Sequence, residues 1–483
     1  MDIRRRGLLI EGNKQNQDIE FDYNFKYFTL HMLGDGDVTL FKPTSYEANS
    51  LYYSLNDNDW ISFDNEITLP LVSDDEIRIK CITNSYQRGT TRHMFNCTCD
   101  YEVYGNAMSL LYGDNFYYQL ALKGGYSFDS LFYNQINIKS VINLILPAIV
   151  LTDYCYYGMF YGCSSLTFAP ELPATILANS CYRDMFQNCT DLLFVPDLLA
   201  TELTPYCYNW MFYGCTSLIE APIIKGEVLS NDCCNSMFKN CVSLIEAPEL
   251  PATTLAQDCY SNMFQGCTSL TVAPELPATI LADYCYYGMF NGCTSLIETP
   301  ELPATTLANY CYQSMFQNCA SLTKITNLPA TTLTPYCYHS MFYNCTSLIS
   351  APELPATTLA NYCYYYMFRG CTSLTSAPTE LPAMTLTNYC YAYMFEMCSS
   401  LSVSPILPAE KLTARCCQYM FRNCSKLNKI TMLATNISAV GCLSNWVSGV
   451  ASSGTFIKNA AMTSLPNGTS GIPTGWTVQN YNK

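Results

Sequence analysis

One phrase, Cys-Tyr-x-x-Met-Phe-x-(Gly/Asn)-Cys-x-x-Leu, recurs along this 483-residue chain with small variations. A fixed period of this kind predicts a solenoid, because each repeat can bury its apolar side only against its neighbours. The phrase occurs eleven times at a spacing of 26 residues, with one residue inserted near Thr379, and its first cysteines are Cys155, Cys181, Cys207, Cys233, Cys259, Cys285, Cys311, Cys337, Cys363, Cys390 and Cys416. Decayed copies at Leu131-Phe132 and after Cys442 are typical of capping repeats.

The spacing within a repeat predicts one short helix followed by one short strand. Cys155, Tyr156, Met159 and Phe160 fall on one side of a helix with 3.6 residues per turn. Gly or Asn stands before the second cysteine in all copies but one, and these residues tolerate the left-handed conformation that ends a helix. Met397 is the exception and should be strained. We therefore expect an α/β solenoid with the leucine-rich repeat layout, about eleven repeats plus caps, preceded by a small all-β domain.

Composition shifts divide the chain into five parts. Residues 1–20 are a polar N-terminal arm, and residues 21–104 are a β-sandwich-like attachment or capping module, since short β runs alternate there with turn signals. Residues 105–150 form the lead-in and N-terminal cap repeat, 151–441 the solenoid, and 442–483 the C-terminal cap. The chain has no apolar stretch of transmembrane length and no apolar leader after Arg4 to Arg6, so we expect no membrane insertion.

The 28 cysteines contrast with only three histidines. Two cysteines eight residues apart would lie about 12 Å apart along a helix, which is too far for a disulfide. The cysteines are therefore interpreted as small buried apolar residues. Zinc remains an alternative only at Cys233-Cys234, Cys416-Cys417 or Cys97-Thr98-Cys99, none of which has paired CxxC spacing. We expect no metal and no cofactor.

Two sets of side chains are candidates for binding. The positions two, three and six residues after the first cysteine vary most, and Tyr, Trp and Arg are the residue types that dominate binding contacts. The candidates from this set are Trp210, Tyr213, Tyr365, Tyr366, Arg369 and Tyr393. A ladder of carboxylates, Glu249, Glu275, Glu301 and Glu353, follows the repeat prolines and could hold a cation or a basic partner. Unconstrained surface variation and a solvated acidic face are the alternatives for the two sets.

The formal charge of −15 argues against nucleic acid as a partner, because a phosphate backbone repels an acidic protein. The chain contains no P-loop, HExxH or GxSxG motif, so we expect no catalytic residues and no enzyme activity. A pair of glycan-cleaving carboxylates remains the less favoured alternative.

The phrases MFxGCTSL, NYCY and APELPATTLA (Ala247–Ala256) resemble the BspA-like leucine-rich repeats of surface proteins from gut Bacteroidetes and of their tailed phages. The resemblance implies adhesion or recognition. Because no leader is visible, the expected function is that of a phage virion component, a tail fibre or capsid decoration, that recognises the host. Its N-terminal region would contact other virion proteins, and its array a host cell-surface protein or glycan, with a homo-oligomer possible. The alternative is an adhesin on the bacterial cell surface.

Overall fold

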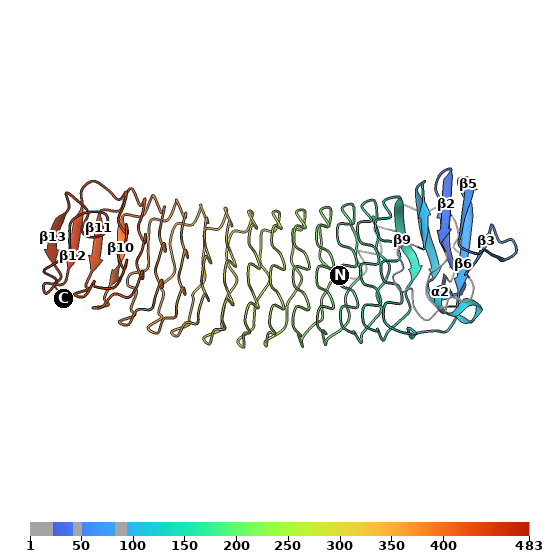
Figure 1. Ribbon diagram of the computed structural model, residues 1–483, viewed down its shortest axis with the longest axis horizontal. Helices are drawn as coiled ribbons and strands as arrows, with labels where there is room; N and C mark the ends of the chain where they lie inside the picture. The colour runs from blue at the N-terminus through green and yellow to red at the C-terminus, as the bar shows by residue number, and fades with distance from the viewer. Residues whose placement is uncertain (1–22, 42–50, 83–93, 483) are drawn as a thin grey trace.

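The computed structural model describes residues 23–41, 51–82 and 94–482. These residues form a rod, with a group of strands at one end and the C terminus at the other (Figure 1). The predicted arm, residues 1–20, lies outside the described residues. In the part of the chain that is described, no helix has both the length and the apolar character needed to cross a membrane.

Two sheets occupy the N-terminal end. The larger has the strand order β4-β3-β6-β1-β8-β9, and the smaller has the order β5-β2-β7. The larger contains β1 (Phe28–Met32), β3 (Leu51–Leu55), β4 (Ile61–Ser62), β6 (Glu76–Cys81), β8 (Tyr101–Asn106) and β9 (Ile138–Ile145). The smaller contains β2 (Gly36–Phe41), β5 (Glu66–Leu71) and β7 (Phe95–Cys97). The short helices in this region are η1 (Tyr23–Phe25), α2 (Ser109–Tyr112) and η2 (Gly113–Asn115).

The larger sheet runs directly into the repeat array. Its strands pair antiparallel except for β8 and β9, which are parallel. Ser140 of β9 then bridges to Phe168 of the first repeat, so β8 covers the edge at which the array begins. A single cluster of buried side chains extends through both regions. The predicted boundary at residue 104 falls inside β8.

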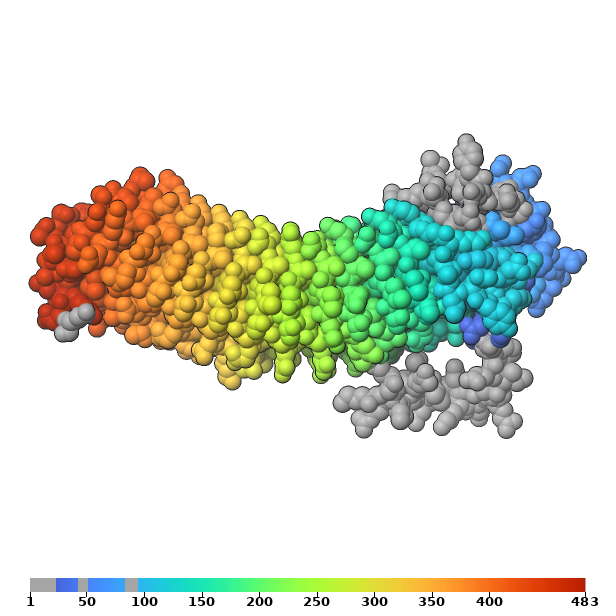
Figure 2. All heavy atoms as spheres, turned by 90° about the horizontal axis from the view of Figure 1, so that it is seen from below, coloured from blue at the N-terminus to red at the C-terminus, as the bar shows by residue number. Residues whose placement is uncertain are grey.

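Each repeat is one coil of the rod, and most coils contribute isolated bridges rather than the short strand that was predicted. One ladder includes Phe168 bridged to Phe194, and another runs through Thr306, Thr332 and Thr358. Beyond β9, the longer parallel strands of the described residues lie at the C-terminal end, in the order β10-β11-β12-β13. These are β10 (Val403–Leu407), β11 (Lys429–Met432), β12 (Thr455–Lys458) and β13 (Thr477–Asn480). In the space-filling view the coils succeed one another along the rod in sequence order (Figure 2).

The helix predicted in every repeat is wrong. Thr152–Cys163 is instead a ribbon of consecutive turns, which we call the turn segment, as we do its equivalents in the other coils. Its N–H groups alternate between two kinds of acceptor. Tyr156 and Gly158 donate to carbonyls of the next coil, at 2.9 Å each, whereas Met159 donates to the carbonyl three residues earlier, at 3.2 Å. The turn segments therefore hold the coils together with a ladder of backbone hydrogen bonds.

The backbone explains why no helix forms. Tyr154, Gly158 and Gly162 have φ of 57°, 53° and 72°, so every fourth residue is left-handed. A right-handed helix cannot include such residues regularly. An apolar period of four residues fits a four-residue turn unit as well as it fits a helix, and this is why the spacing led to the wrong prediction of a helix. The predicted left-handed position before the second cysteine is present, and Met397 adopts it with φ of 64°.

Aromatic rings stack through the interior of the rod. Phe132, Phe160 and their equivalents continue to Phe421, with neighbouring ring centroids 4.9 to 5.7 Å apart and planes within 12° of parallel. Trp446 ends the row, 5.9 Å from Phe421. Such spacing brings the coils much closer than the 8–10 Å expected between packed helices. Because the turn segment is not a helix, the distance of about 12 Å expected between the two cysteines of a repeat no longer has a basis.

The cysteines are nonetheless free thiols, and all are buried except Cys99, which is partly exposed. The second cysteine of each repeat also has a polar contact that the sequence did not suggest. Cys267, for example, donates its thiol proton to the carbonyl oxygen of Phe238 across 3.1 Å. The same contact, at 3.0 to 3.2 Å, occurs at Cys163, Cys189, Cys215, Cys241, Cys293, Cys319, Cys345, Cys371, Cys398 and Cys424.

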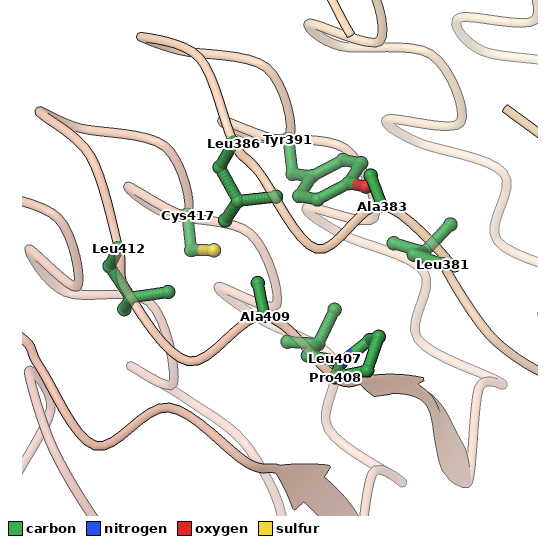
Figure 3. A pocket seen from close by; sticks show the side chains of 9 residues that line it. All are labelled: Leu381, Ala383, Leu386, Tyr391, Leu407, Pro408, Ala409, Leu412 and Cys417. Carbon is green, nitrogen blue, oxygen red and sulfur yellow. The ribbon is translucent and has the colours of Figure 1, made fainter. Parts of the chain in front are cut away.

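A second interior row, of tyrosines, is interrupted where cysteine replaces tyrosine. Tyr364 stacks on Tyr391 at 6.0 Å, but the next coil has Cys417. The smaller side chain leaves an apolar cavity of about 10 Å³ beside the Tyr391 ring and Leu412 (Figure 3). A space of this size with an almost wholly apolar lining does not favour a bound water.

Candidate binding surface

The side chains at positions one before and two, three and six after the first cysteine form the outer side of the turn segments, which we call the turn face. The prediction that the variable positions are exposed is only partly correct. Trp210 is 39% exposed, but Asp184, Asn209, Ala392 and Glu396 are buried. These four residues are buried because neighbouring coils are only about 5 Å apart, so that side chains of adjacent coils cover one another.

Four predicted residues come together near the C-terminal end of this face. We define the distal patch as Tyr365, Tyr366, Arg369, Tyr393, Tyr419 and Arg422. Tyr366 lies 4.1 Å from Tyr365 and 4.7 Å from Tyr393, measured between ring centroids, and Tyr393 lies 4.8 Å from Tyr419. All four rings are partly exposed. Tyr419 and Arg422 were missed by the sequence analysis, although they occupy the same repeat positions.

A buried carboxylate fixes the arginines of the distal patch. The Glu396 side chain is 3% exposed and is ion-paired with Arg369 on one side and, at 3.5 Å, with Arg422 on the other. The Arg369 guanidinium also lies over the rings of Tyr366 and Tyr343, at 5.0 and 5.3 Å, and that of Arg422 lies 5.1 Å from Tyr419. The arrangement combines cation–π contacts with a positive charge that Glu396 only partly neutralises.

A further row of tyrosines borders the patch, one residue before the first cysteine of each coil. We call Tyr284, Tyr310, Tyr336, Tyr362 and Tyr389 the tyrosine row. Its rings are parallel, 4.4 to 4.8 Å apart, and partly exposed. Arg415 follows in the next coil and donates a hydrogen bond to the hydroxyl of Tyr389. The repeated NYCY phrase contains this position and was a signal that could have revealed the row.

The backbone at these tyrosines is unfavourable for a large side chain. Tyr366, Tyr393 and Tyr419 have φ of 60°, 58° and 53°. Other coils place Gly288 or Asn262 at the same position, and these residue types adopt the left-handed conformation at little cost. An aromatic residue there costs on the order of 1–2 kcal/mol. The distal patch therefore keeps aromatic residues where the backbone alone would favour smaller ones.

Trp210 and Tyr213 lie in a separate cluster. Their ring centroids are 6.3 Å apart, and the Arg183 guanidinium lies 5.7 Å from both Trp210 and Tyr206. Six coils separate this cluster from the distal patch, a distance of about 30 Å at the spacing of neighbouring strands. The structure therefore divides the six predicted contact residues between two sites.

The predicted acidic ladder is exposed and lies away from the turn face. Glu249, Glu275, Glu301 and Glu353 all face solvent. Glu353 accepts hydrogen bonds from the amide and hydroxyl of Thr379, the latter at 2.9 Å. Within residues 23–41, 51–82 and 94–482, no group of three or more His, Cys, Asp or Glu is arranged to hold a metal ion. These ranges contain the carboxylates from Glu249 to Glu353 and the three cysteine pairs considered for zinc.

A protein-family model described as "BspA type Leucine rich repeat region (6 copies)" matches this chain at residues 128–271, 260–401 and 339–443. A search of curated proteins gave no significant match. Two solved structures share low identity. A leucine-rich repeat protein from Bacteroides ovatus is 17% identical, covering 72% of this chain and 88% of its own, with a TM-score of 0.36. The TLR13–ssRNA13 complex is 14% identical, covering 69% and 41%, with a TM-score of 0.26. The matched repeats, which extend over more than half of the sequence, confirm the resemblance found in the repeated phrases: the chain belongs to the BspA-type leucine-rich repeat family.

Proposed function

We propose that this chain is a non-enzymatic recognition protein whose distal patch contacts the surface of a bacterial cell. The observation that carries the proposal is the retention of Tyr366, Tyr393 and Tyr419 at left-handed positions, beside paired arginines. Backbone strain held at exposed aromatic residues is typical of binding sites, where the gain comes from the contact. Stacking between the rings offsets part of this strain, but it does not require that the rings remain exposed.

The proposed location is a phage virion, as a tail fibre or capsid decoration. The N-terminal sheets would contact other virion proteins, and the rod would project the distal patch away from the particle, because these sheets and the C terminus lie at opposite ends of the rod (Figure 1). The family match is equally compatible with an adhesin on a bacterial surface, which is the second candidate. Antibody labelling of purified phage particles and of fractionated cells would separate the two locations.

Binding of the labelled full-length protein to intact gut Bacteroidetes cells, measured by flow cytometry, tests the proposal. The variant Tyr365→Ala with Tyr393→Ala should lower cell binding by about tenfold or more, since aromatic anchors account for most of the binding free energy. Phe194→Ala is the matched control. Phe194 is 52% exposed and stacks on Phe168 at 5.3 Å, but it belongs to a bridge ladder outside the turn face. Equal binding by both variants and the wild type would remove the distal patch as the contact site.

A further inference from the structure

We infer that the distal patch, together with Arg415, binds an anionic polysaccharide. The inference rests on the proposed function, because it names the chemical class of partner for the same surface. It follows from three observations: the distribution of charge along the rod, the saturation of the backbone hydrogen bonds under the patch, and the polar groups that the patch presents.

Charge is segregated along the array. Residues 151–362 contain seventeen acidic and four basic side chains, whereas residues 363–483 contain three acidic and eight basic ones. In the turn segments that begin near Cys363, Cys390 and Cys416, the charged residues are Arg369, Glu396, Arg415 and Arg422. Because Glu396 is buried, the exposed charge of this surface is entirely positive. An anionic partner would be repelled by most of the rod and attracted to this end.

The backbone beneath the patch has no vacant amide for a peptide strand. Tyr366 donates its N–H to Ala392 of the next coil and Gly370 donates to Glu396, while Arg369 donates within its own coil. The same alternation continues from Tyr391 through Met397. A partner therefore cannot add to this surface as a β-strand and must be recognised by side chains alone.

Those side chains offer guanidinium and phenol groups. The Arg415 guanidinium makes one hydrogen bond, to Tyr389, and no ion pair with the residues that the structure describes, which leaves most of its five N–H donors for an anion. Guanidinium groups bind carboxylate and sulfate oxygens through paired hydrogen bonds, and tyrosine hydroxyls both donate to and accept from other hydroxyls. A chain that carries hydroxyls and anionic groups, but no backbone amides in need of partners, matches this set. An anionic polysaccharide has that composition, whereas an acidic peptide does not.

Dextran sulfate and uncharged dextran, immobilised on a sensor surface, form a matched pair of probes for the full-length protein. We expect binding to dextran sulfate that weakens as salt is raised, and none to dextran. Arg415→Gln with Arg422→Gln should lower the affinity about tenfold or more and flatten the salt dependence, because hydrogen bonds to charged groups are lost. Arg183→Gln is the matched control, since Arg183 also lies over tyrosine and tryptophan rings but belongs to the acidic part of the array.

Arg415→Gln alone provides a second variant that does not disturb the Glu396 ion pairs, so a loss of binding cannot be attributed to misfolding of that cluster. Undiminished binding by the double variant, or equal binding to both dextrans, would overturn the inference. Polyglutamate that binds as tightly as dextran sulfate would overturn the choice of a polysaccharide. Cell binding that survives while dextran sulfate binding is absent would leave the proposed function in place and remove only this inference.

Discussion

Phe264 lies at the middle of the interior phenylalanine row, and its truncation to alanine is the most direct perturbation of the array. The side chain is fully buried, with Phe238 and Phe290 stacked on its two faces at 5.7 and 5.6 Å. Truncating a buried phenylalanine costs about 3–5 kcal/mol. The loss of two stacked neighbours places Phe264→Ala in the upper part of that range.

Hydrogen exchange followed by mass spectrometry is the appropriate assay, because a repeat array need not unfold as a single unit. A local loss of about 4 kcal/mol corresponds to exchange about a thousandfold faster. We expect this acceleration in the coils that contain Cys233, Cys259 and Cys285, with smaller effects further away.

Phe194→Ala serves as the control here as well. Its ring is stacked on one face and half exposed, so the expected cost is about 1 kcal/mol. Unchanged exchange near Phe264 would show that the ring is not part of the core. Equal acceleration along the whole chain would refute the view that each coil depends chiefly on its neighbours.

Three further predictions concern the thiols, the buried carboxyl group of Asp184 and the strained backbone at Met397. In the native protein an alkylating reagent should modify at most Cys99, and in denaturant without reductant it should modify the remaining cysteines; disulfides found by mass spectrometry would contradict the thiol contacts. Burial raises the pKa of Asp184 to about 6, so its ionised form destabilises the fold. Asp184→Asn should therefore add up to about 2–3 kcal/mol at pH 7; the difference from the wild type vanishes below about pH 4, grows between pH 4 and 6 and levels off above pH 6, as measured by denaturant unfolding. Met397→Asn should raise the thermal midpoint and stabilise by about 1 kcal/mol, because asparagine tolerates the left-handed backbone better; a lowered midpoint would show that the Met397 side chain contributes more than its strain costs.

The left-handed residues of the backbone show which features of the fold a sequence pattern can predict. The position before the second cysteine was predicted correctly, because Gly and Asn are nearly invariant there within the chain. The two other left-handed positions of each turn segment were not, because tyrosine occupies many of them, as at Tyr154 and Tyr366. Tyrosine gives no signal of positive φ. Its cost is offset by hydrogen bonds to the next coil and by ring stacking, and neither exists until the coils stack.

The sequence by itself determined the repeat, its period, and which apolar side chains of the repeated phrase are buried. These follow from apolar residues that recur at fixed spacing, such as Cys155, Met159 and Phe160. The same spacing places these residues on one buried side whether the segment is a helix or a turn ribbon. The tertiary structure alone decided between a helix and a turn ribbon. The turn ribbon forms because its N–H groups donate to backbone carbonyls of the next coil, 25 residues away in the sequence. It also decided which aromatic residues form one surface. Tyr365, Tyr366 and Tyr393 meet because consecutive coils place them side by side, whereas Trp210 lies six coils away, and no local pattern contains that distance.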